Sequence, residues 1–243
     1  MELHQKKEEN VTEEDPAECG DCYTLTAMES DTRLWISHHE GHRTTDDATE
    51  LFEDIERKRN SDSEIPLFIS DDWDAFEEGL LEVYGKMEQP PYKGIGRKPN
   101  PVLVPAEDLK YAQVCKKREK GGVVGMVKRV VFGNLEQILA ILGADADDNI
   151  STSYIERLNL TIRNSLARFI RKTMNFSKKK RIHSKYVDFV QAWYNFVKPH
   201  ISLRIPATDG KRKWKQRTPT MAKGLTDHIW TLEELLMFRV SVQ

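Results

Sequence analysis

Cysteine is scarce in this chain: three of its 243 residues are cysteines, at positions 19, 22 and 115. Three thiols are too few for the disulfide framework on which small secreted domains depend. The sequence also contains no run of about 18 apolar residues, the length that a membrane-spanning helix needs. Its N-terminus is charged and lacks the apolar core that signal peptides share. These absences argue against secreted and membrane-spanning classes, and we expect a soluble protein of the cytoplasm.

A large net charge is absent as well, because 37 basic and 39 acidic residues leave the chain at −2. The two signs are, however, separated along the sequence. Residues 1–90 hold 8 basic and 26 acidic side chains, whereas residues 91–243 hold 29 basic and 13 acidic ones. Such a split is typical of a protein whose basic part binds nucleic acid. The acidic part could bind divalent metal or form a solvated surface, and the sequence leaves both open.

Cys19 and Cys22 have the spacing of half a zinc site, and His38 and His42 follow at a distance close to that of a zinc finger. Between these pairs, residues 22–28 and 33–39 are rich in Thr, Tyr, Trp and Leu, which predicts an antiparallel hairpin. The hairpin would bring the Cys and His pairs close together. The same residues serve equally well as strand ends, and a finger needs a helix to carry its histidines. Zinc binding therefore stays an open alternative.

The rest of the chain alternates between helical and extended patterns. Thr44 to Asp47 is a helix-capping sequence, and Ala48, Leu51, Phe52 and Ile55 follow it at helical spacing. Further helices are predicted over residues 72–84, 134–142, 153–172, 177–197 and 231–238, and strands over residues 65–69, 111–115 and 123–132. Residues 89–105, 116–122 and 143–149 are predicted to be a loop, a turn and a flexible linker. This order predicts an α/β protein with a mixed sheet flanked by helices.

Two acidic residues stand out as candidate catalytic groups. Asp71 follows the strand predicted at residues 65–69, at the carboxyl edge where α/β proteins gather ligands. It can equally be the cap of the next helix, as can Asp72 or Ser70. Glu156 is the only acid between residues 149 and 187, and four arginines and a lysine follow it within 16 residues. It is either a structural ion-pair partner or a metal ligand beside a phosphate-binding surface.

A family resemblance favours the second interpretation. The segment from Ser151 to Arg163, with Leu166-Ala167-Arg168 after it, resembles the third-acid helix of transposases of the insertion sequence one type. Ser70-Asp71-Asp72-Trp73 resembles the strand end that carries their second acid. Tyr194 to His200 and residues 217–236 are similar to the closing segments of bacterial and archaeal relatives. The resemblance covers nearly the whole chain in the correct order, and the third-acid helix is its most specific part.

The resemblance implies an RNase H-like catalytic core over residues 1–200, with an inserted hairpin, an insertion at about 86–148 and a helical C-terminal segment. A tail with a terminal helix follows at residues 201–243. It further implies metal-dependent DNA cleavage and strand transfer at two Mg²⁺ or Mn²⁺ ions, with Asp71 as the second of three carboxylate ligands and Glu156 as the third. The residues implied to contact DNA phosphates are Arg157, Arg163, Arg168, Arg171, Lys172, Lys178, Lys179, Lys180 and Arg181. The implied partners are transposon ends, target DNA and further copies in a homodimer or larger assembly, because two DNA ends must be joined.

The first carboxylate of the family is missing from its expected place. The family has an Asp-Glu-Leu-like segment there, whereas residues 1–7 of this sequence read Met-Glu-Leu-His-Gln-Lys-Lys. Glu2 would point to the opposite face of a strand from its neighbour, and Asp21 belongs to the loop before the next strand. The sequence thus predicts an N-terminally truncated copy. Three hypotheses follow: a transposase catalytic core, a non-catalytic DNA-binding remnant that acts by mixed assembly with an intact copy, or a different metal nuclease or nucleic-acid-binding module. In the third, Asp71 and Glu156 would be structural.

Overall fold

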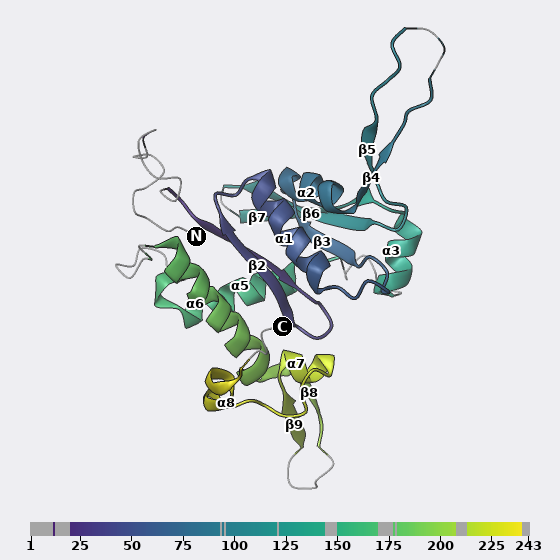
Figure 1. Ribbon diagram of the computed structural model, residues 1–243. Helices are drawn as coiled ribbons and strands as arrows, with labels where there is room; N and C mark the ends of the chain where they lie inside the picture. The colour runs from purple at the N-terminus through teal and green to yellow at the C-terminus, as the bar shows by residue number, and fades with distance from the viewer. Residues whose placement is uncertain are drawn as a thin grey trace. The chain divides into compact units, whose positions relative to one another are not determined.

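The computed structural model describes residues 12, 20–92, 94, 96–120, 122–143, 150–169, 177, 179–207 and 213–239. The chain divides into two compact units (Figure 1). We call residues 43–156 the central unit, and residues 1–42 together with 157–243 the terminal unit. Helices and strands alternate along the chain, which confirms the predicted mixed α/β composition.

The central unit is built on a three-stranded sheet. Its strands, in spatial order, are β3 (Leu67–Asp71), β6 (Lys110–Glu119) and β7 (Gly122–Phe132). β3 runs parallel to β6 and β7 runs antiparallel to it, which confirms the predicted mixed sheet. The strand predicted at residues 65–69 begins two residues later, and its apolar side chains are half-buried rather than buried. Asp71 is the last residue of β3, so it lies at the predicted carboxyl edge.

β6 is longer than the sequence predicted. A turn was expected at residues 116–122, where Lys, Arg and Gly dominate. In the structure, Lys116 to Glu119 continue β6 and pair with Gly122 to Met126 of β7. The prediction of a turn was therefore wrong over Lys116 to Glu119, because backbone pairing with a neighbouring strand can outweigh the weak strand preference of charged residues.

Two helices cover the face of the sheet that carries Phe68: α1 (Thr45–Lys58) and α2 (Asp74–Tyr84). α1 begins as predicted with a capping box, in which the Thr44 hydroxyl accepts a hydrogen bond from the Asp47 N–H at 3.2 Å. All four apolar residues predicted to form its inner face are buried. One of them, Phe52, packs edge-on against Phe68 of β3 at a ring-centroid distance of 5.5 Å. α1 is thus confirmed in its start and in its buried face.

The opposite face of the sheet packs against α3 (Leu135–Leu142), which begins at its N-cap Asn134 as predicted. The buried cluster on this face contains Ala112, Val114, Ile138 and Ile150, with Leu67, Ile69, Val130 and Leu142 packed against it. Helices on both faces enclose the sheet of the central unit, as the sequence predicted.

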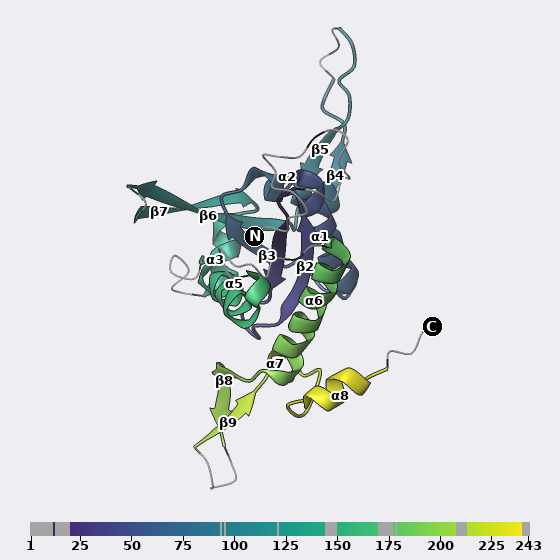
Figure 2. The same cartoon turned by 90° about the vertical axis from the view of Figure 1, so that its left-hand side faces the viewer.

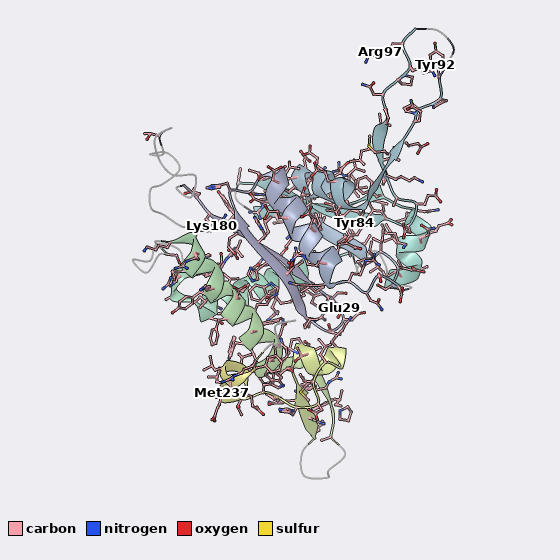
Figure 3. The ribbon with its side chains drawn as sticks, viewed as in Figure 1. Glu29, Tyr84, Tyr92, Arg97, Lys180 and Met237 are labelled. Carbon is pink, nitrogen blue, oxygen red and sulfur yellow. The ribbon has the colours of Figure 1, made fainter. Side chains whose placement is uncertain are left out.

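A short hairpin was missed in the proline-rich stretch at residues 89–105. Its second strand, β5 (Val102–Pro105), pairs antiparallel with β4 (Gly85–Glu88). Tyr92 and Arg97 lie at the far end of this hairpin (Figure 3), where the Tyr92 hydroxyl donates to the Gly96 carbonyl at 2.9 Å. Proline is tolerated at the end of a two-stranded ladder because few backbone donors are needed there. Of the predicted linker at 143–149, residues 144–149 lie outside the described residues.

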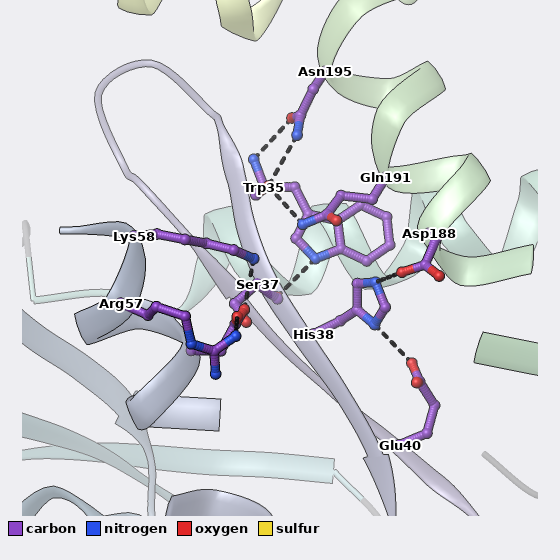
Figure 4. A network of polar contacts seen from close by, with 10 residues as sticks. Trp35, Ser37, His38, Glu40, Arg57, Lys58, Asp188, Gln191 and Asn195 are labelled. Carbon is purple, nitrogen blue, oxygen red and sulfur yellow. Dashed lines mark hydrogen bonds and ion pairs between the residues drawn. The ribbon is translucent and has the colours of Figure 1, made fainter. Parts of the chain in front are cut away.

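The terminal unit contains the predicted hairpin, formed by β1 (Tyr23–Met28) and β2 (Trp35–Gly41). α6 (Lys180–Ala192) and the π-helical turn η3 (Trp193–Val197) follow each other and anchor Trp35, which is 1% exposed (Figure 4). The Trp35 N–H donates to Asn195 Oδ1 at 3.0 Å, and Asn195 Nδ2 donates to the Trp35 carbonyl at 2.9 Å. Gln191 Nε2 donates to the same carbonyl at 2.9 Å. The side chains of Gln191 and Asn195 therefore supply the hydrogen-bond partners of the buried N–H and carbonyl groups of Trp35, the first residue of β2.

The remaining predicted helices are present with shifted ends. The helix predicted at residues 153–172 ends earlier, as α5 (Ser153–Ser165) and a 3₁₀ turn η2 (Ala167–Phe169). The tail contains β8 (His200–Pro206), β9 (Trp214–Arg217) and α7 (Pro219–Lys223), which were not predicted, and α8 (Leu232–Met237), which confirms the predicted terminal helix. None of the helices in the described part of the chain has the length and apolarity that crossing a bilayer requires.

Replacing Asn195 by Ala should destabilise the protein. The change leaves the buried Trp35 N–H without its acceptor, and we expect the free energy of unfolding to fall by about 2 kcal/mol. Urea denaturation followed by tryptophan fluorescence measures this change. The control is Asn164→Ala, at an exposed position of α5, which should shift the free energy by no more than about 0.5 kcal/mol. Equal midpoints for the two variants would contradict the anchoring role of Asn195.

Candidate active site

Asp71 is held by its backbone and leaves its side chain exposed. Its carbonyl accepts hydrogen bonds from the Trp73 N–H at 3.0 Å and from the Ser70 hydroxyl at 2.7 Å. Ser70 in turn hydrogen-bonds to the Tyr111 hydroxyl at 2.7 Å. The Asp71 carboxylate has no hydrogen bond or ion pair with another described residue. A residue whose backbone is held in place and whose carboxylate has no partner among the described residues is well suited to bind a ligand.

The alternative that Asp71, Asp72 or Ser70 caps the next helix is wrong. The N-cap of α2 is Trp73, and no side chain caps this helix. Asp72 instead lies near Arg129, with 3.7 Å between Oδ1 of Asp72 and Nη2 of Arg129. Capping therefore does not account for the acidic pair at the end of β3.

Glu156 lies in the first turn of α5 and contacts β6. Its Oε1 accepts hydrogen bonds from the Lys116 ammonium and from the Thr152 hydroxyl, the latter at 2.7 Å. The hydrogen bond from Lys116 lowers the pKa of Glu156; burial opposes this in part, and Thr152 and the charges of Lys116 and Arg118 lower it further. The side chain of Glu156 remains 53% exposed. Glu156 is therefore an ionised carboxylate that solvent and ligands can reach.

The sheet register brings Asp71 and the partner of Glu156 to one face. Asp71 lies directly beside Val114, and Lys116 follows Val114 by two residues on β6. Directly paired residues of a sheet point to the same face, as do residues two apart on one strand. Asp71, Val114 and Lys116 thus share a face, and Glu156 contacts that face through Lys116. The two carboxylates predicted from the sequence therefore lie toward the same face of the sheet, near its carboxyl edge.

The donor atoms of this site suit a divalent metal, because Mg²⁺ and Mn²⁺ prefer carboxylate oxygens. Within the described residues, no group of three or more acidic, His or Cys side chains lies close enough together to hold an ion. Residues 1–7, where the family resemblance expects a first carboxylate, are outside the described residues. The described part of the chain thus supplies two oxygen donors of the right chemical type.

The zinc alternative finds little support at His38. Its Nδ1 lies 2.8 Å from Glu40 Oε1, and its Nε2 lies 3.2 Å from Asp188 Oδ1 (Figure 4). Both ring nitrogens therefore have carboxylate partners, and His38 links β2 to α6. Cys22 is buried, and Cys19 lies outside the described residues. The contacts of His38 favour the alternative in which these residues end the strands of the hairpin.

The predicted DNA contacts are only partly described. Those with exposed side chains are Arg157, Arg163, Lys179 and Arg181, and Lys180 at the start of α6 is half-buried (Figure 3). Arg168 is engaged within the terminal unit, where it donates to the Ser177 hydroxyl at 3.2 Å and stacks over the Tyr186 ring at 4.3 Å. Arg171, Lys172 and Lys178 lie outside the described residues.

Lys116 contacts a candidate site residue, Glu156, and the sequence did not identify it. It was assigned to a turn, and its contact with Glu156 spans 40 residues of sequence. The one signal available was the spacing of Val114, Lys116 and Arg118, which are two residues apart and would share one face of a strand. This spacing is informative only when β6 is known to continue through the segment.

Replacing Lys116 by Met should raise the pKa of Glu156 toward its ordinary value of about 4.3, because the hydrogen bond that lowers it is lost. A ¹³C NMR titration of the Glu156 carboxyl measures this shift. Since the folded-state pKa is depressed, the contribution of the pair to stability is present above the unfolded-state pKa. It is lost as the pH falls through the folded-state pKa.

The matched control for this titration is Lys117→Met, because Lys117 points to the other face of β6 and should leave the Glu156 titration unchanged. If Lys116→Met also leaves the pKa of Glu156 unchanged, the contact between the two side chains is not the cause of the shift.

Comparison with known proteins adds one finding. Residues 144–196 match the family model of the IS1 transposases, and this segment includes α5, with Glu156, and α6. No curated protein and no solved structure gives a significant match to the chain. The matched segment covers less than a quarter of the chain, and through it the chain is similar to the IS1 transposases around Glu156.

Proposed function

We propose that this chain forms the catalytic core of a DDE-type transposase, which cleaves DNA and transfers the cut strand. Asp71 and Glu156 would be two of its metal-binding carboxylates. The observation that carries the proposal is the position of Glu156, which lies within the matched segment and contacts the sheet face that Asp71 shares. Two residues chosen from separate parts of the sequence thus lie toward one surface.

The chemistry would depend on Mg²⁺ or Mn²⁺, which in such sites activate the attacking oxygen and stabilise the leaving oxygen of a phosphodiester. The protein contributes ligand position and charge. The ladder with β6 fixes Asp71, and Thr152 orients Glu156 at the start of α5. Lys116 lowers the pKa of Glu156 further below neutrality and so favours the ionised form, which is the form that binds a metal.

The same proposal covers the architecture. We infer an RNase H-like core over residues 1–200, with an insertion at about 86–148 and a tail at 201–243. Two observations support it: the parallel pair β3–β6 and the helices on both faces of the β3-β6-β7 sheet. This sheet is mixed, is flanked by helices and has an acidic residue at the carboxyl end of a strand. Many α/β enzymes place their active sites in such an arrangement.

DNA would be held mainly by basic side chains of α5 and α6. Arg157 and Arg163 on α5, and Lys179 and Arg181 around the start of α6, are exposed and available for phosphate contacts. Phosphate contacts position the duplex without reading its sequence. Two or more copies of the chain would assemble, because strand transfer joins two DNA ends to a target.

The second candidate is a non-catalytic DNA-binding protein that acts by mixed assembly with an intact transposase. The observation in its favour is that the described residues gather no more than two candidate carboxylates, one of which is bonded to Lys116. In this case the basic surface would bind DNA, and Asp71 and Glu156 would have structural roles.

Cleavage of labelled DNA in the presence of Mg²⁺ or Mn²⁺ tests the first candidate. We expect Asp71→Asn and Glu156→Gln each to reduce the rate by at least about a hundredfold, because each removes a charged oxygen ligand. Asp74→Asn and Glu53→Gln are matched controls at exposed positions of the same unit and should retain activity.

The outcomes separate the two candidates. Cleavage that survives both Asp71→Asn and Glu156→Gln would refute the site assignment. Tight DNA binding without cleavage at any metal concentration, by a chain with intact secondary structure, would favour the non-catalytic alternative.

A further inference from the structure

The outer part of the β6–β7 hairpin extends past the core of the central unit (Figure 2). We call residues 116–127 the ribbon. Three of its apolar side chains are more than half exposed: Val123 at 53%, Val124 at 58% and Met126 at 62%. The ribbon is therefore maintained by the pairing of its two strands, from Lys116 with Met126 to Glu119 with Gly122. An exposed surface of this kind, rimmed by polar side chains, is typical of an interaction site.

Positive charge is concentrated on this part of the sheet. Residues 116–129 contain six basic side chains and one acidic side chain, Glu119. The alternation of a strand divides these charges between two faces. Lys116 lies on the face of Asp71, whereas Lys117 lies on the opposite face. The register with β7 shifts between Lys117 and Arg118, where it skips Val124; since the extra residue belongs to β7, β6 keeps its alternation and Arg118 shares the face of Lys116.

A separate observation agrees with this division. The Lys116 ammonium bonds to Glu156, and the charge of Arg118 acts on the same carboxylate. Both cations are therefore directed to the candidate active site. The side chain of Lys116 is 24% exposed and that of its partner Glu156 is 53% exposed, so the pair lies at the surface rather than in the core.

We propose that the Asp71 face of the ribbon contacts the DNA backbone, and that Lys116 and Arg118 are positioning residues that hold a phosphodiester beside Asp71 and Glu156. This inference rests on the proposed function and adds a DNA contact outside α5 and α6. Basic side chains neutralise phosphates, and a two-stranded ribbon fits the major groove of a duplex. Lys116 can exchange a carboxylate oxygen for a phosphate oxygen, because an exposed ion pair is weak.

The test compares two adjacent cations of equal charge on opposite faces. Binding of the full chain to a fluorescein-labelled duplex of mixed sequence is measured by anisotropy, in EDTA, over a series of salt concentrations. We expect Arg118→Gln to weaken binding about fivefold at low salt and to reduce the slope of log K against log salt by about 1. Lys117→Gln should have little effect, and Arg118→Lys should retain the wild-type slope.

Lys116→Gln extends the test toward the active site. It should reduce the salt slope as Arg118→Gln does, and the double variant should reduce it by about 2. Circular dichroism confirms that the exposed substitutions leave the fold intact. Because EDTA removes divalent metal, this readout does not depend on cleavage.

Three results would overturn the inference. One is an equal loss of affinity in Arg118→Gln and Lys117→Gln, which would indicate general charge attraction. Another is an unchanged salt slope in the Lys116 and Arg118 variants. The third is binding of polyglutamate with the same dependence on Arg118, which would indicate an acidic protein as the partner. Failure of the catalytic proposal looks different, because cleavage would then be absent while the face-dependent binding remained.

Discussion

The parallel pairing of β3 with β6 is the constraint on which the candidate site depends. A parallel pair cannot be closed by a tight turn, so the chain must leave the end of β3 and return to the start of β6. Here α2 and the β4–β5 hairpin make that connection. The resulting register places Asp71 beside Val114. The shared face of Asp71 and Lys116 follows from this register, and the contact of Lys116 with Glu156 brings α5 to the same face.

The two faces of this sheet have different roles. Aromatic packing of α1 and α2 around Phe68 covers one face, while α3 and Ile150 cover the base of the other. Beyond this second cluster the strands β6 and β7 continue with charged and exposed side chains. The buried part therefore fixes the position of Asp71, and the extended part carries cations on the same face of the sheet. Stability and proposed DNA contact are thus provided by successive segments of the same two strands.

Local signals in the sequence predicted local structure well. The capping sequence and the spacing of four apolar residues predicted α1 with its buried face, because both depend on residues within a few turns. The end of β6 was missed because Lys116 to Glu119 have little intrinsic strand preference and are held by pairing with β7. Asp71 and Glu156 were identified as candidates, but their common face depends on the register between β3 and β6. Sequence spacing contains no information about that register, and Lys116 could not be recognised without it.

The strength of an ion pair decides whether it can take part in a reaction. His38 and Glu40 are 8% and 6% exposed, and separating such a buried pair would leave buried polar groups without a partner. Lys116 and Glu156 are 24% and 53% exposed, and pairs of this kind contribute at most about 1 kcal/mol. A phosphate or a divalent ion can therefore replace one partner at little cost. The more exposed pair at the edge of the sheet, rather than the buried one in the terminal unit, therefore suits the proposed active site, because groups that bind a substrate must exchange partners when it arrives.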